Sequence, residues 1–201
     1  LTTKGGTDKI MEYFGSGTNA ISATGKATIT NMGAELGATT SVFPFDNRTN
    51  TYLRATGRDQ IADLAESYQE FLKADVEVME DPARYYDQII EIDLDTLEPY
   101  VVGPHSPDVA HPISRLADDA KEHGYPTEIK VALIGSCTNS SYEDIGRAAH
   151  VARQAVERGV TSQSQFMITP GSEQIHETIS RDGQLEVLGQ VGGQVLANAC
   201  G

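Results

Sequence analysis

The chain has 201 residues, of which 39% are hydrophobic and 22% are charged, and its formal net charge is -14. A chain of this length can form one large domain or two small ones. The negative charge argues against a broad basic surface for nucleic acid, and no apolar run approaches the ~18 residues of a membrane span. We therefore expect a soluble globular protein without a nucleic-acid or membrane partner.

Short strands and one helix rich in small residues are predicted near the start of the chain. The residue pattern predicts strands at 9–14 and 39–45 and a helix over 22–36. On this helix Asn31 and Glu35 stand four positions apart, so they face the same way. Periodicity alone favours an ordinary solvated polar pair at these two positions.

The clearest amphipathic helix is predicted over residues 58–73. Its apolar side chains recur at helical spacing and form one stripe, so we interpret it as scaffold. The stripe consists of Ile61, Leu64, Ala65, Tyr68, Phe71 and Leu72. Residues 86–92 alternate between apolar and polar side chains, which predicts a further strand.

Four of the eight prolines gather in one short stretch, at Pro99, Pro104, Pro107 and Pro112. Proline removes an N–H donor and fixes φ, so this stretch is interpreted as a connector. We place a domain boundary there, which predicts domains of residues 1–98 and 99–201. His105 and His111 lie in the connector, and we interpret both as exposed loop residues rather than ligands.

Beyond the connector, helices and strands alternate regularly. Apolar spacing predicts one helix that ends at Gly124 and others that begin near Ser141 and Ser172. Strands are predicted at residues 130–134, 165–169 and 194–199. Crossovers of this length imply a parallel sheet with right-handed connections. The predicted fold class is α/β, with βαβ units, a parallel sheet and two partial domains.

A cysteine stands at the turn between the first of these strands and its helix. Cys137 lies in the sequence Gly-Ser-Cys-Thr-Asn, and Ser140 with Glu143 three residues later predicts a capping box. Free N–H groups and the helix dipole favour negative charge at a helix N-terminus. We therefore expect Cys137 to lean towards the thiolate, which ligates metals or attacks carbon.

The second cysteine, Cys200, follows the last predicted strand. Because the carboxyl ends of parallel strands meet at one edge, Cys137, Cys200 and the turn at 170–172 are expected on the same edge. Two thiols do not complete a metal site, since a catalytic zinc or an iron–sulfur cluster needs at least three ligands. The residues alone leave three alternatives open: an incomplete metal site, a Cys137 nucleophile, or structural thiols.

Four segments carry a resemblance to a known family. At residues 28–41, 134–144, 168–175 and 195–201 the sequence closely resembles the aconitase (aconitate hydratase) family, of the mitochondrial type. The resemblance extends over essentially the whole chain and implies an aconitase-like fold. Because the chain begins at Leu1 and the family enzyme is several times longer, we expect an interior portion: part of the second α/β domain and the first part of the third.

The resemblance implies an iron–sulfur hydro-lyase that interconverts citrate and isocitrate through cis-aconitate in the tricarboxylic acid cycle. In this family three cysteines hold a 4Fe-4S cluster, and an open iron acts as a Lewis acid on the substrate. The first two family cysteines match Cys137 and Cys200, and the third would stand three positions beyond Cys200. Asn31 and Glu35 match the pair that approaches the iron-bound water or the substrate hydroxyl.

The chain also departs from the family pattern. Thr30 replaces a cysteine that is common at this non-ligand position. The serine base, the Asp-His pairs and the carboxylate-binding arginines of the family have no counterpart here, so we expect no intact cluster and no turnover from this chain alone. The implied partners are a tricarboxylate substrate and the remainder of its own polypeptide; the family is usually monomeric. The implied location is the mitochondrial matrix, although no targeting segment is present.

Three competing functions are weighed against this one. Homoaconitase and isopropylmalate isomerase share the Gly-Ser-Cys-Thr-Asn turn, but the upstream helix and the 169–174 loop look more like aconitase. Clusterless relatives bind RNA hairpins, which the charge of -14 opposes. A Cys137 nucleophile needs a base, and the nearest histidine in sequence, His150, lies well along the following helix.

Overall fold

The structure, a computed structural model, describes residues 2–136 and 138–198. It divides into two compact units, Leu1–Tyr125 (unit 1) and Pro126–Gly201 (unit 2). The division falls after the proline-rich connector because that connector is tied back to unit 1: the Asp108 carboxylate accepts hydrogen bonds from the N–H of Thr3 (2.7 Å) and from its hydroxyl (3.2 Å). Family domains of residues 1–98 and 99–201 stay a prediction.

Unit 1 contains one βαβ element. Strands β1 (Ile10–Glu12) and β2 (Thr40–Val42) pair in parallel, and helix α1 (Ala23–Glu35) connects them and packs on β2. The Ser22 hydroxyl caps α1 by accepting from the Gly25 N–H at 3.0 Å. The predicted helix and both predicted strands are confirmed, and each strand is shorter than predicted.

A helical region follows β2. Helix α2 (Asn47–Ala55), which was not predicted from the sequence, packs against α3 (Asp59–Ser67), and the short α4 (Val76–Glu80) follows. Single 3-10 turns occupy Gln69–Phe71 and Pro82–Arg84 in this region, and a further one, at Ser16–Ala20, precedes α1. The amphipathic stripe predicted over 58–73 faces solvent in this chain. Its large members are exposed: Ile61, Leu64, Tyr68, Phe71 and Leu72.

The strand predicted at residues 86–92 is wrong. The structure shows no strand there, and Ile89, Ile90 and Ile92 are exposed. An extended segment becomes a strand only when its backbone N–H and C=O groups find a neighbouring strand, and alternation in the sequence does not supply one.

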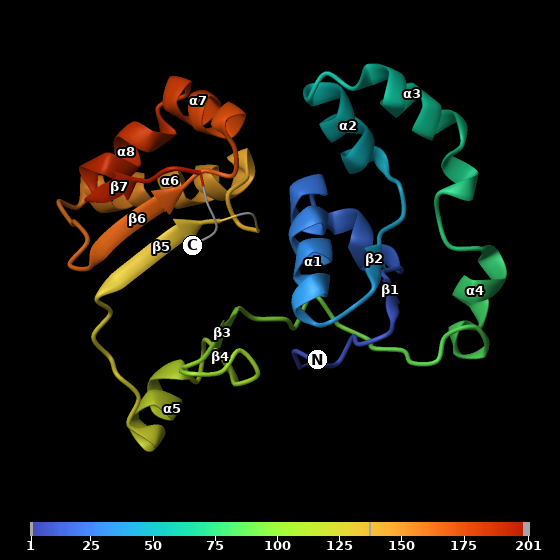
Figure 1. Cartoon of the computed structure of the whole chain (residues 1–201), viewed down its shortest axis with the longest axis horizontal. Helices are drawn as coiled ribbons and strands as arrows, with labels where there is room; N and C mark the ends of the chain where they lie inside the picture. The colour runs from blue at the N-terminus through green and yellow to red at the C-terminus, as the bar shows by residue number, and fades with distance from the viewer. Residues whose placement is uncertain (1, 137, 199–201) are drawn as a thin grey trace. The chain divides into compact units, whose positions relative to one another are not determined.

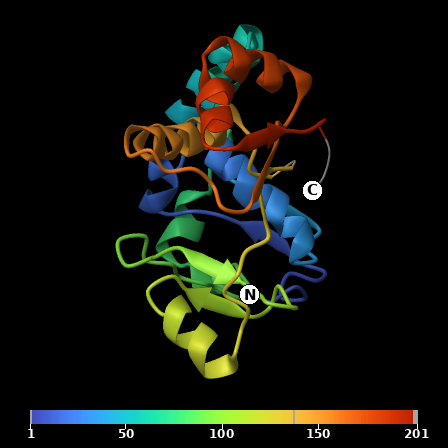
Figure 2. The same cartoon turned by 90° about the vertical axis from the view of Figure 1, so that its left-hand side faces the viewer.

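The proline-rich connector forms a hairpin. Strands β3 (Tyr100–Val102) and β4 (Ala110–Pro112) pair antiparallel, and helix α5 (Leu116–His123) follows and ends at the left-handed Gly124, as predicted. Figure 2 shows the hairpin beside α5. His105 is exposed, as predicted, but His111 is 7% exposed, so its assignment as an exposed loop residue is wrong. It is buried because β4 presents it to α5, where its Nδ1 lies 2.8 Å from the Asp119 carboxylate.

Unit 2 is a parallel α/β layer structure (Figure 1). Strands β5 (Val131–Gly135), β6 (Gln165–Thr169) and β7 (Gly193–Val195) pair in parallel in the order β5-β6-β7. Helices α6 (Tyr142–Glu157), α7 (Glu173–Arg181) and α8 (Gln184–Gln190) pack together over the sheet. The predicted parallel sheet is confirmed.

The hydrophobic core of the described residues lies in unit 2. Its buried members come from all three helices, from the central strand and from the residue that follows α8: Ile145, Ala149, Ala152, Ile168, Ile179, Val187, Leu188 and Val191. The opposite side of β5 carries the exposed Val131 and Leu133. None of the helices in residues 2–136 and 138–198 combines the length and the apolar character needed to cross a bilayer.

Candidate functional site

The loop after β5 begins with a sharp turn that only glycine can make. Gly135 has φ +148°, and a Cβ built on it would lie 1.9 Å from the Thr169 Oγ1 atom and 2.4 Å from the Thr169 carbonyl oxygen. Ser136 follows with φ 68° and donates its N–H to Thr169 Oγ1 at 2.8 Å. The end of β5 therefore lies directly against the end of β6, and residue 137 follows two positions later.

The loops after β5 and β6 are also joined to each other. Ser140 is 2% exposed, and its hydroxyl donates to the Ser136 carbonyl oxygen. The Gly171 N–H donates to the Ser140 carbonyl oxygen at 3.3 Å, and a Cβ at Gly171 would lie 2.7 Å from the Ser140 hydroxyl. Small side chains at these positions let the two backbones approach closely.

The capping box at the start of α6 lies one residue later than predicted. Ser141, not Ser140, is the N-cap: its hydroxyl accepts from the Asp144 N–H at 3.2 Å, and Asp144 accepts from the Ser141 N–H at 3.1 Å. Ser140 is instead committed to the loop contact with Ser136, and Glu143 pairs with Arg147 at 2.6 Å. Because Asp144 brings its own negative charge, it already complements part of the helix dipole there.

The segment after β7 reaches the same edge of the sheet. The Leu196 N–H donates to the Ile168 carbonyl oxygen at 2.8 Å, which continues the strand pairing past β7. Further on, the Asn198 amide donates to the Glu173 carboxylate at 3.0 Å, at the start of α7. The three post-strand loops of unit 2 therefore converge on one edge, as predicted.

The two predicted thiol ligands, Cys137 and Cys200, lie outside the described residues. The structure describes Ser136 and Thr138 on either side of position 137, and Asn198 two positions before position 200. The assignment of the thiols as cluster ligands stays a prediction.

Asn31 and Glu35 belong to α1 of unit 1. Both are exposed and lie one helical turn apart on the last two turns of the helix. The structure thus assembles two separate sets of predicted site residues: the loops of unit 2 that contain the cysteine positions, and the Asn31–Glu35 pair.

A hollow of about 640 Å³ in unit 1 was not predicted from the sequence. It is lined mainly by apolar side chains of α1, of residues 42–45, of α2 and of the 71–74 segment. Its charged lining residues are Glu12, Lys26, Arg58 and Lys73, and neither Asn31 nor Glu35 lines it. No local pattern marks it, because its walls come from segments that are distant in sequence.

Lys26 is the most deeply buried charged residue of this hollow. It is 5% exposed, and its Nζ lies 2.5 Å from the Asp46 Oδ2. Burial alone would raise the pKa of Asp46, but hydrogen bonds from Lys26 and Thr49 outweigh it and lower that pKa below its ordinary value. Asp46 also caps α2 by accepting from the Thr49 N–H at 2.9 Å. The pair therefore joins α1 to the start of α2.

The sheet of unit 2 is parallel, and the loops at its carboxyl edge contact each other through glycine and serine residues. This arrangement is typical of the class of α/β proteins that bind ligands at the carboxyl edge of the sheet. The sequence profile of the Aconitase family (aconitate hydratase) matches residues 1–201, so the chain belongs to the aconitase family.

Similar sequences span the whole chain. It is 59% identical over 201 residues to the probable mitochondrial aconitate hydratase of Dictyostelium discoideum, 56% to the mitochondrial aconitate hydratase of Schizosaccharomyces pombe and 54% to that of Saccharomyces cerevisiae. In each case all of this chain is covered but only 25% of the relative's length.

Proposed function

We propose that this chain is part of an aconitate hydratase, a hydro-lyase that interconverts citrate and isocitrate through cis-aconitate in the tricarboxylic acid cycle of the mitochondrial matrix. One observation carries the proposal: relatives with that name and that printed location are 54–59% identical over all 201 residues. The converging loops of unit 2 support it, because the most constrained turn, at Gly135, lies two positions before Cys137.

The loops of unit 2 fit a 4Fe-4S cluster. Crowding at Gly135 and Gly171 leaves no room for a side chain at these two positions of the edge, and Cys137 and Cys200 would supply two of the thiolates. The third would come from the remainder of the polypeptide. When bound, the cluster supplies a Lewis-acidic iron that polarises a hydroxyl group.

Asn31 and Glu35 would act on the hydroxyl that is lost or gained in the reaction. A carboxylate at Glu35 can accept and return a proton, and the amide of Asn31 can orient the same oxygen by donating a hydrogen bond. Their spacing of one helical turn on α1 supports a shared target.

The remainder of the same polypeptide is proposed as the partner of unit 1. Among the described residues of unit 1, Ala62 is the one hydrophobic side chain that is fully buried. The α3 stripe and the hollow beside Lys26 leave large apolar side chains in solvent, Phe71 among them at 74% exposed. Such surfaces are stable when other parts of a protein cover them.

The test is anaerobic reconstitution with iron and sulfide of this chain and of the full-length protein. We expect a stable visible cluster absorbance and hydration of cis-aconitate from the full-length protein only. In that protein Cys137→Ser and Cys200→Ser should each abolish the absorbance, whereas Ser180→Ala, at an exposed position on α7, should leave it unchanged.

The catalytic pair is tested separately from the cluster. In the full-length protein Glu35→Gln should retain the cluster absorbance and lose at least about 100-fold in kcat, with the exposed Glu157→Gln as the matched control. A full-length protein that takes up no iron would overturn the proposal and favour Cys137 as a nucleophile.

A further inference from the structure

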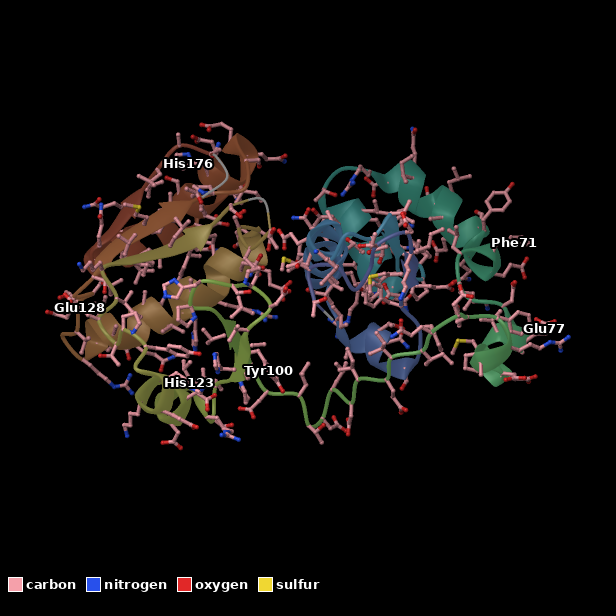
Figure 3. All side chains as sticks on the ribbon, turned by 60° about the horizontal axis from the view of Figure 1, so that its bottom comes forward. Phe71, Glu77, Tyr100, His123, Glu128 and His176 are labelled. Carbon is pink, nitrogen blue, oxygen red and sulfur yellow. The ribbon has the colours of Figure 1, made fainter. Side chains whose placement is uncertain are left out.

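Three side chains on the first turns of α7 place possible metal ligands together. Glu173, His176 and Glu177 each offer one ligand atom, and these atoms all lie within 4.8 Å of one another. Figure 3 labels His176 among the side chains of this helix.

The distances between the His176 nitrogen and the two carboxylates are too long for good hydrogen bonds, but they suit ligand atoms that share one cation. The His176 Nδ1 atom lies 3.4 Å from the Glu177 Oε1 atom and 3.9 Å from the Glu173 Oε1 atom. Zinc–ligand bonds of ~2.0–2.1 Å arranged as a tetrahedron place neighbouring ligand atoms roughly 3.3 Å apart. A small closing movement of exposed glutamate side chains would therefore bring all three atoms to bonding distance of one ion.

The ring nitrogen of His176 that faces the glutamates is not engaged in a hydrogen bond with any described residue. Its Nδ1 atom is shielded from solvent and has no hydrogen-bond partner among the described residues, although the side chain as a whole is 33% exposed. An unpaired polar atom in a shielded position costs free energy, and a bound cation would remove that cost.

One of the two carboxylates is already oriented. The Asn198 amide, from the segment after β7, donates to the Oε2 atom of Glu173 at 3.0 Å and leaves the Oε1 atom towards His176. Hydrogen bonds of this kind fix a ligating carboxylate and raise the affinity of a metal site.

We propose that Glu173, His176 and Glu177 form a binding site for one divalent cation of the zinc type, such as Zn²⁺, Co²⁺ or Ni²⁺. An imidazole nitrogen with two carboxylates suits these ions better than Ca²⁺ or Mg²⁺, which prefer oxygen ligands alone. The two carboxylates match the charge of the ion, and water completes the coordination. The Glu-x-x-His spacing on one helix face recurs in metal sites built on helices.

Binding there would also act on the neighbouring loop. A cation at the Oε1 atom of Glu173 restrains the same carboxylate that accepts from Asn198. Occupancy of the site therefore stabilises the first turn of α7 and its attachment to the segment after β7.

The test is titration of this chain with Co²⁺ and Zn²⁺ alone, after both thiols have been alkylated so that the cysteines cannot bind them. The wild-type chain should bind one Co²⁺, followed by its visible absorption, and Zn²⁺ should displace it. His176→Asn and Glu177→Gln should each weaken binding by at least about tenfold.

Matched controls on the same unit distinguish a built site from scattered surface binding. His150→Asn and Glu186→Gln remove the same types of side chain from exposed positions on α6 and α8, and neither should change the affinity. Circular dichroism checks that each variant is folded, and the exposed Glu177→Gln keeps the test valid if His176→Asn is not. Absence of saturable binding, or equal losses in control and site variants, would overturn the proposal.

Discussion

Single positions carry the tightest constraints in this chain, and the glycine at the end of β5 is the clearest of them. Gly135 is enclosed by Thr169, whose hydroxyl and carbonyl oxygens occupy the space where a Cβ would lie. Thr169 at the end of β6 thus excludes every residue except glycine at position 135. The sequence predicts a turn at this glycine, but its contact with Thr169 could not be predicted, because that contact depends on how β5 and β6 align.

Gly135→Ala should destabilise unit 2 by at least about 3 kcal/mol, because the new methyl group would displace the end of β6. The matched control is Gly189→Ala on α8, where nothing lies within 4 Å of the added methyl group. That change should stabilise the chain by ~0.5–1 kcal/mol, since alanine favours helix. Urea unfolding followed by circular dichroism measures both, and equal stabilities of the two variants would contradict the steric account.

The buried pair Lys26–Asp46 gives a second prediction at this scale. Lys26→Met leaves the carboxylate without its cation and should cost about 3 kcal/mol near pH 7. The exposed Lys121→Met on α5 serves as the control and should change stability by less than about 0.5 kcal/mol.

The same pair should make the stability of unit 1 depend on pH. Because the pKa of Asp46 is lower in the folded chain than its ordinary 3.8, the unfolded state binds this proton more readily. The stabilisation is therefore present above pH ~3.8 and is lost as the pH falls through the folded pKa. The difference in unfolding free energy between wild type and Lys26→Met should shrink over that range; a constant difference would show that the ion pair is not its source.

At the scale of helices and strands, the predictions for unit 2 agree closely with the structure, whereas those for unit 1 agree only in part. Strand β6 begins and ends as predicted, and α6 and α7 begin after the serines that cap them. Those signals are local. The β3–β4 hairpin was missed, and the strand predicted at 86–92 is wrong, since strand pairing depends on distant partners.

Ile179 on α7 tests the core that these helices share. It is fully buried, so Ile179→Ala should cost ~2–5 kcal/mol through lost packing and a residual cavity. Val151→Ala on α6, at a side chain that is 65% exposed, should cost less than about 0.5 kcal/mol. Chemical unfolding measures the free energy of unfolding of both variants. Comparable losses of stability in the two would mean that α7 does not close the core.

At the scale of the whole molecule, the chain separates into two compact units joined at Tyr125 and Pro126. The sequence indicated two parts, but the proline cluster drew the predicted boundary towards residue 98. The connector is instead held to the rest of unit 1, because its Asp108 accepts a hydrogen bond from the Thr3 N–H and Glu98 accepts one from the Ser114 N–H. Proline marks where a chain turns, and the contacts that follow decide to which unit the turn belongs.

Separate units should lose their structure separately. In hydrogen exchange read by mass spectrometry, Ile179→Ala should speed exchange in peptides from β6, α6 and α8 and leave α1 and β2 unchanged. Lys26→Met should instead speed exchange in peptides from α1 and β2 and leave those from β6, α6 and α8 unchanged, so it serves as the reciprocal control. Faster exchange throughout both units with either variant would show that the chain unfolds as one body.

The order β5-β6-β7 also bears on how the protein is made. Each strand lies beside the strand synthesised just before it, so the sheet can grow by addition at one edge as the chain leaves the ribosome. Among the described strands of this sheet, none must insert between two that have already paired. The first two strands and α6 can therefore form a template before translation reaches β7, and the loops at the carboxyl edge meet in the order in which they are translated.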